Sequence, residues 1–170
     1  QYFLASDNYG GSALWLDRVA TRYERHFSEL SPALLDQVFG SLYFLAHTGA
    51  DHPIWNRMIR DLAEIAARSR DPRVLGRIAP LGLHLNILRG DFSAARWYLS
   101  HLGPIVASPL APPFLRAMVC GSAAVVAWQE AQHDMARQST AEGIQIGIDY
   151  GIEAATFIVQ AQQAYTALSA

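Results

Sequence analysis

The stretch LRGDFSAAR at residues 88–96 decides the fold, because it has the pattern of one helix ending and the next beginning at once. Gly90 can adopt the left-handed backbone conformation that ends a helix, without the steric penalty that a Cβ atom would bring. Asp91 can cap the first amides of the following helix, and the small side chain of Ala95 allows two helices to approach closely. The stretch therefore predicts a helical hairpin that turns at Gly90.

The features of this turn recur at a spacing of about 41 residues. Gly49 and Ala131 stand one period before and after Gly90, and Ala136 stands one period after Ala95, although Ile54 takes the corresponding place one period before. Mainly apolar residues fall in matching columns, such as Leu42, Leu83 and Ala124; Tyr43, His84 and Val125; and Phe44, Leu85 and Val126. Stacked helix pairs require such columns, because a single pair cannot cover its own apolar face. The sequence predicts an all-α fold of repeated antiparallel helix pairs.

Helical periodicity and capping signals set the expected elements. We expect helices at residues 12–27, 31–47, 53–69, 73–88, 92–102, 114–130, 136–150 and 152–168. Four prolines within residues 103–113 predict an extended connector rather than a helix. The register continues across this connector, so we expect residues 1–170 to form a single helical repeat domain, a fragment of a longer chain. Its repeats are expected near residues 1–28, 31–69, 72–102, 113–150 and 152–170.

Composition narrows the classes of partner. The chain has 170 residues, 51% of them hydrophobic and 16% charged, and a formal net charge of −2. We expect no direct binding to nucleic acid, because there is no excess of basic residues to hold phosphates. No apolar run reaches the roughly 18 residues of a membrane span, so we expect no membrane association. A single cysteine fits a reducing compartment, and the expected location is the cytoplasm.

Motifs of catalysis and metal binding are missing from the sequence. It contains no phosphate-binding P-loop, no G-x-S-x-G nucleophile elbow and no H-E-x-x-H zinc motif. His47, Asp51 and His52 surround one expected turn and are a possible metal cluster. Ordinary turn and capping roles explain them better, since no further histidine or cysteine stands at ligand spacing. We therefore expect no metal and no cofactor.

The remaining reactive side chains also have simple interpretations. Cys120 lies in the apolar run AMVC at residues 117–120, where a cysteine is usually a small buried apolar residue rather than a nucleophile. Asp61 and Glu64 are expected on the solvated face of a helix. We therefore expect that the chain is not an enzyme.

The pattern L-x-G-D-F-x-x-A at residues 88–95, with leucines at positions 99 and 102, resembles the small-residue core of a tetratricopeptide repeat. The period is longer than the roughly 34 residues of the standard repeat. Longer, irregular repeats are typical of the helical region of MalT-type bacterial transcriptional regulators, and residues 128–144 and 160–168 resemble that region. The resemblance implies a right-handed superhelix, or α-solenoid, whose NTPase and DNA-binding modules lie outside this chain.

The same resemblance implies a binding groove, because the first helix of each tetratricopeptide pair lines the concave face. Candidate groove residues, counted back from the turns, are Asp36, Phe39, Tyr43, His47, Arg77, His84, Trp128 and Gln129. Such aromatic and hydrogen-bonding side chains suit a peptide terminus or a small polar effector. In the alternative interpretation, Tyr43 and Trp128 belong to the core between repeats and His84 is a partly exposed helix residue.

We therefore expect a non-enzymatic helical-repeat module for protein interaction or effector sensing within a larger bacterial signalling or transcriptional regulator. The alternative is a small-molecule-binding or accessory helical domain of a multidomain enzyme. We also expect self-association through a truncated end, either the helix at residues 152–168 or residues 1–5 with Trp15, because few charges cover these apolar segments.

Overall fold

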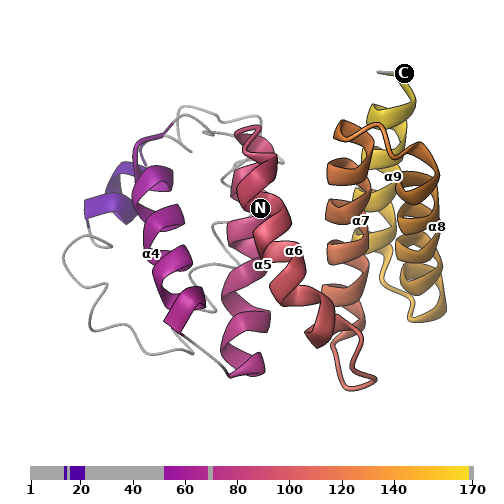
Figure 1. Cartoon of the computed structure of the whole chain (residues 1–170), viewed down its shortest axis with the longest axis horizontal. Helices are drawn as coiled ribbons and strands as arrows, with labels where there is room; N and C mark the ends of the chain where they lie inside the picture. Colours follow the sequence, from indigo (N-terminus) through magenta and orange to yellow (C-terminus); the bar gives the residue numbers. More distant parts are fainter. Residues whose placement is uncertain (1–13, 15, 22–51, 69–70, 169–170) are drawn as a thin grey trace. The chain divides into compact units, whose positions relative to one another are not determined.

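The computed structural model describes residues 14, 16–21, 52–68 and 71–168, and its regular elements within these ranges are all helices (Figure 1). The described part contains no strand, so the all-α prediction is confirmed. Residues 16–21 are helical, and six longer helices follow: α4 (Ile54–Arg68), α5 (Pro72–Leu88), α6 (Phe92–Val106), α7 (Pro113–Gln129), α8 (His133–Asp149) and α9 (Glu153–Leu168). The helix expected at residues 31–47 lies outside the described residues.

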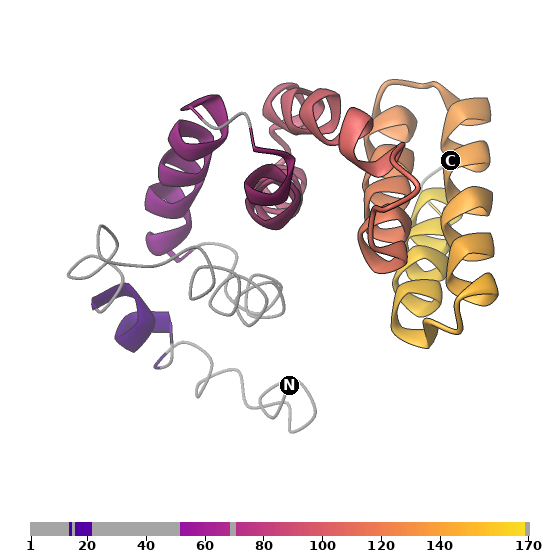
Figure 2. The same cartoon turned by 90° about the horizontal axis from the view of Figure 1, so that it is seen from below.

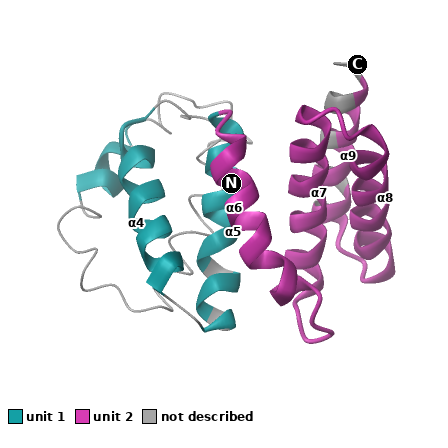
Figure 3. Ribbon diagram, viewed as in Figure 1, with its two compact units in different colours: residues 1–89 teal, residues 90–170 magenta. Residues whose placement is uncertain are grey.

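The chain divides into two compact units, residues 1–89 and residues 90–170 (Figure 3). The first unit holds α4 and α5, and the second holds α6 to α9. The organisation of residues 1–170 as one repeat domain remains a prediction.

In the first unit, α4 and α5 pack against each other. One face of α4 is buried at helical spacing, through Ile54, Trp55, Met58, Leu62 and Ala66. The Arg89 guanidinium, just after the end of α5, donates a hydrogen bond to the amide oxygen of Asn56 in the first turn of α4. Pro72 is the first residue of α5, where the absence of its amide hydrogen leaves no helix bond unmade. The expected start of this helix is therefore confirmed to within one residue.

Residues in the left-handed conformation follow the ends of three helices. Gly90 follows α5 with φ 73°, Ala131 follows α7 with φ 59°, and Gly151 follows α8 with φ 64°. At the start of α6, the Asp91 carboxylate accepts a hydrogen bond of 3.0 Å from the backbone N–H of Ala94. The turn and the cap predicted around Gly90 are both present.

The helix end at Ala131 is closed by two backbone hydrogen bonds. The N–H of Ala131 donates to the carbonyl of Trp128 at 3.0 Å, and the N–H of Gln132 donates to the carbonyl of Ala127 at 2.9 Å. This pair of bonds defines the Schellman motif, which normally has glycine at its left-handed position. Ala131 therefore holds the left-handed position after α7, as Gly151 does after α8.

The second unit is a bundle in which α7 contacts α6, α8 and α9, and α8 also contacts α9 (Figure 2). Two glycines allow α8 to approach its neighbours closely. A Cβ atom built on Gly143 would lie 3.1 Å from the Cβ of Cys120 in α7 and 3.3 Å from a methyl of Val159 in α9. A Cβ atom built on Gly147 would lie 3.1 Å from the backbone nitrogen of Thr156 in α9. The packing of α8 therefore depends on these two residues having no side chain.

Two expected boundaries are wrong. The helix that was expected to end at residue 102 continues to Val106, with Pro104 inside its last turn. The residue before Pro104 is Gly103, whose missing Cβ removes part of the clash that normally keeps such a residue out of the helical region. The helix expected from residue 136 begins at His133, because the left-handed Ala131 completes the turn early and Gln132 accepts the first helical hydrogen bond, from the N–H of Ala136 at 3.0 Å.

Within the described residues, no helix combines the length and the hydropathy that a membrane span requires.

Candidate functional site

The second unit carries an open groove of about 660 Å³ at one end of its bundle. We call it the α8 groove. Its lining residues are Trp128, Ala131, His133, Asp134, Ala136, Arg137, Thr140, Gln163 and Ala167.

Three helices and one turn position these side chains. Trp128 lies in the last turn of α7, and Ala131 forms the turn into α8. His133, Ala136 and Thr140 follow at spacings of three and four residues, which places them on one face of α8. Gln163 and Ala167 are one turn apart near the end of α9. The end of α7, the start of α8 and the end of α9 lie at the same end of the bundle, since successive helices alternate in direction (Figure 1).

Apolar surface forms much of the groove. The indole of Trp128 is half-buried, and Ala136 is buried at 6% exposure. Ala131, Ala136 and Ala167 have the smallest side chains with a Cβ atom, so they leave open volume beside the indole. This arrangement suits an inserted apolar group, because such a group loses contact with water and gains the face of an aromatic ring.

Polar partners are present for three side chains of the groove, Asp134, Arg137 and Thr140. The Arg137 guanidinium forms an ion pair with the Asp134 carboxylate three residues earlier, and both side chains are exposed. The Thr140 hydroxyl is buried and donates to the carbonyl of Ala136 at 2.8 Å. The groove therefore presents a polar rim without a strong net charge, which favours an uncharged or weakly charged ligand.

The residues expected from the sequence are distributed between the two units. Trp128 lines the α8 groove, whereas its neighbour Gln129 is exposed and does not line it. Arg77 and His84 lie in α5, within the first unit, and His84 is buried at 5% exposure rather than partly exposed. The remaining candidates lie outside the described residues: Asp36, Phe39, Tyr43 and His47.

Sequence reasoning missed the contribution of α8, the second helix of its pair. His133, Arg137 and Thr140 recur at spacings of four and three residues, so a polar face on this helix is visible in the sequence. Gln163 and Ala167 carry no comparable signal. They join the groove only through the packing of α9 against α7 and α8.

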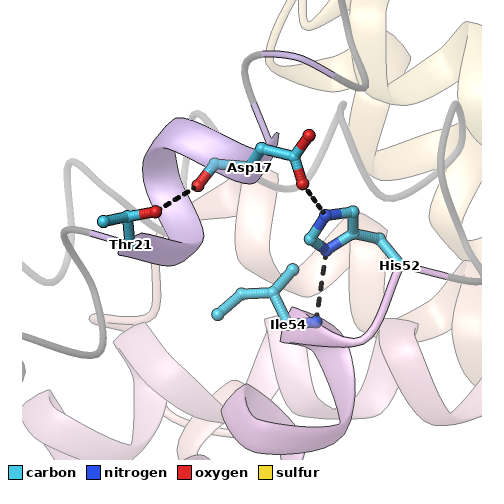
Figure 4. Close-up of polar contacts among 4 residues, drawn as sticks. All are labelled: Asp17, Thr21, His52 and Ile54. Atoms are coloured by element: carbon cyan, nitrogen blue, oxygen red, sulfur yellow. Dashed lines mark hydrogen bonds and ion pairs between the residues drawn. The ribbon is translucent and has the colours of Figure 1, made fainter.

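His52 has a capping role at the start of α4 (Figure 4). Its Nδ1 accepts a hydrogen bond of 3.2 Å from the backbone N–H of Ile54, so the ring proton lies on Nε2 and is donated to the Asp17 carboxylate at 3.0 Å. The Thr21 hydroxyl donates in turn to the carbonyl of Asp17 at 3.0 Å. The capping interpretation of His52 is confirmed. His47 and Asp51, the other members of the possible metal cluster, lie outside the described residues.

Across the residues that the structure describes, no three or more histidine, cysteine or acidic side chains gather closely enough to hold a metal ion.

Cys120 is an unreactive thiol at neutral pH. It packs against the buried cluster of Ala117, Ile146 and Ala155. Burial, and after it the carboxylate of Glu142, raise the pKa of the Cys120 thiol from 9.0 to about 11, although the Arg116 guanidinium acts in the opposite direction. The thiolate needed for nucleophilic attack is therefore scarce near pH 7, as expected for a packing residue.

The two acidic residues of α4 differ in environment. Glu64 is exposed and forms an ion pair of 2.5 Å with Arg68, as expected for a solvated face. Asp61 is buried, and its two carboxylate oxygens accept hydrogen bonds of 3.2 and 3.0 Å from the Nε of Arg57. The expected surface position of Asp61 is therefore wrong, because the buried face of α4 extends to this residue and Arg57 compensates its charge.

No protein-family model, curated protein or solved structure matches the chain.

Proposed function

We propose that the chain is a non-enzymatic helical-repeat module that binds a segment of a protein partner in the α8 groove. Its setting is a larger bacterial signalling or transcriptional regulator in the cytoplasm, in keeping with the resemblance of residues 88–95, 128–144 and 160–168 to MalT-type repeats. The observation that carries the proposal is the groove beside Trp128, a concave apolar surface with a polar rim.

Burial in α5 and α7 supports the repeat. Positions 41 residues apart are buried in both helices, namely Leu83 with Ala124, His84 with Val125, and Leu85 with Val126. Ala95 and Ala136, at the matching place after each turn, are also buried, at 0% and 6% exposure. Matching burial at a constant period favours stacked helix pairs, and the tetratricopeptide resemblance implies a right-handed superhelix.

The size and chemistry of the α8 groove support a peptide ligand. Its volume of about 660 Å³ lies within the range of about 300–1,000 Å³ that is usual for ligand sites. The indole of Trp128 offers a flat apolar wall, and the paired Asp134 and Arg137 offer hydrogen-bonding groups for a peptide backbone. A single bulky apolar side chain, flanked by uncharged residues, matches these features.

The proposal is tested by titrating the chain against peptides that carry one bulky apolar residue, and against a panel of metabolites, by calorimetry. Ala167→Trp fills the groove from α9, and Ala164→Trp places the same side chain at an exposed position of α9 that does not line the groove. We expect peptide binding to weaken about tenfold or more in Ala167→Trp and to persist in Ala164→Trp. Binding of a metabolite in place of peptides would contradict the proposal and favour the small-molecule-binding domain of an enzyme.

A further inference from the structure

We propose that a second copy of this chain fills the α8 groove with its proline turn, residues 108–111, so that copies associate head to tail through Leu110. The inference rests on the proposed function, because it assigns an occupant to the same groove. It follows from the exposure of Leu110, the rigidity of the turn that carries it and the position of the turn along α7.

The proline turn holds Leu110 in a defined position. The carbonyl of Ser108 accepts a hydrogen bond of 3.0 Å from the N–H of Ala111, which closes a four-residue turn. The Ser108 hydroxyl oxygen accepts a second bond, of 3.3 Å, from the N–H of Leu110. Pro109 fixes a backbone angle at the first central position of this turn. A side chain held in this way loses little conformational freedom when it binds.

Leu110 is also fully available to a partner. It is 91% exposed, and Phe114, at the start of α7, is 47% exposed. No charged residue occurs in the sequence between Arg96 and Arg116, so the turn and its surroundings carry no formal charge. When another surface covers an exposed apolar side chain on an uncharged, rigid turn, apolar area leaves water and the free energy of the complex falls.

The α8 groove matches this occupant in charge and in size. Its two charged side chains, Asp134 and Arg137, form an ion pair with each other, so an uncharged occupant leaves neither charge buried without its counterion. Its volume of about 660 Å³ exceeds that of one leucine side chain and leaves room for the turn backbone beside Trp128.

The turn of one copy cannot enter its own groove. The proline turn lies just before the first residue of α7, whereas Trp128 and the groove lie at the last turn of the same helix (Figure 1). A helix of 17 residues separates them, which corresponds to about 25 Å along the axis. The contact must therefore join two copies. Because different surfaces meet, each dimer retains one free groove and one free turn, and further copies can add.

A mixing experiment tests this arrangement, because the two surfaces can be removed separately. Leu110→Asp removes the apolar side chain of the turn and leaves the groove intact. Ala167→Trp fills the groove and leaves the turn intact. Both positions are exposed, so we expect both variants to fold, which circular dichroism and thermal unfolding verify. Sedimentation velocity of the whole chain at micromolar concentrations then measures the size of the assemblies.

We expect the wild-type chain and the control Ala164→Trp to form assemblies that grow with concentration. Each groove or turn variant alone is monomeric, and an equimolar mixture of the two forms a dimer that grows no further, because only one intact turn and one intact groove remain in each pair. A monomeric wild type, unchanged association in Leu110→Asp, or a mixture without dimers would each overturn the proposal. If the copies instead associate through their terminal segments, both Leu110→Asp and Ala167→Trp will still associate, and this result also overturns the proposal.

A synthetic peptide of residues 105–116 separates this inference from the proposed function. We expect it to bind wild type and Ala164→Trp, and to bind Ala167→Trp about tenfold or more weakly. If other apolar peptides bind in the groove while this peptide does not and the chain stays monomeric, the inference fails and the proposed function stands. If no peptide of any kind binds, both fail.

Discussion

Ala131 has a backbone conformation that glycine usually supplies. Its φ of 59° places the Cβ atom close to the following carbonyl, at a cost of about 1–2 kcal/mol. Gly151 has nearly the same φ of 64°, and a Cβ atom built there would meet nothing within 4 Å. The two turns therefore have the same backbone conformation, with alanine at the left-handed position of one and glycine at that of the other.

We expect Ala131→Gly to raise the free energy of unfolding by about 0.5–1 kcal/mol. Glycine removes the backbone strain, and this gain exceeds the extra conformational entropy that a glycine loses on folding. Gly151→Ala is expected to lower it by about 1 kcal/mol, through backbone strain alone. Urea unfolding of both variants measures the two changes. Shifts of the same sign would show that the left-handed conformation of Ala131 carries no strain.

The burial of two ionisable side chains, Tyr98 and Cys120, makes the stability of the fold fall at alkaline pH. It raises the pKa of the Tyr98 hydroxyl from 10.0 to about 12, and it is the largest cause of the rise in the pKa of the Cys120 thiol from 9.0 to about 11. The unfolded chain releases these protons at lower pH than the folded chain, so the contribution of both groups is complete below about pH 9 and is lost as the pH rises through 11 and 12.

We expect Tyr98→Phe to reduce this alkaline loss of stability. The Tyr98 hydroxyl is buried and makes no hydrogen bond within the described residues, so at pH 7 its removal leaves the free energy of unfolding unchanged or raises it by about 1 kcal/mol. Thermal unfolding between pH 7 and pH 12 compares the variant with wild type. A large loss of stability at pH 7 would mean that the hydroxyl has a partner essential to the fold.

At the scale of helices, local signals predict most boundaries. The positions of α4, α5, α7 and α9 follow from proline, glycine and apolar spacing, and the structure places them within about one residue of expectation. The end of α6 lies four residues beyond expectation, because Gly103 lacks the Cβ atom that is part of the usual clash between a proline and the residue before it. Of the residues that line the α8 groove, the sequence predicts only Trp128 as a binding residue. Gln163 and Ala167 line it because of the way α9 packs against α7 and α8, which the sequence does not reveal.

The crossing of α8 and α9 is tested at Gly147. A Cβ atom there would collide with the Thr156 hydroxyl and approach the Thr156 backbone nitrogen, so we expect Gly147→Ala to cost on the order of 1–3 kcal/mol. Gln138→Ala in α8 is the control, because this side chain is exposed and we expect its removal to change the free energy of unfolding by no more than about 0.5 kcal/mol. A change of that small size in Gly147→Ala, measured by urea unfolding, would show that α9 does not lie against Gly147.

At the scale of the whole molecule, two locations compete for the binding surface. The tetratricopeptide resemblance implies the first helices, including Arg77 and His84 of α5, whereas the structure forms a groove from the end of α7, the start of α8 and the end of α9. The resemblance alone could not reveal this groove, because it depends on how three successive helices pack against one another.

Amide hydrogen exchange with and without bound peptide tests this assignment most directly. We expect added protection at residues 128–140 and 160–168, around the α8 groove, with no change in α5. Protection of α5 near Arg77 and His84, without any at residues 128–140, would contradict the assignment and place the binding surface on the first helices.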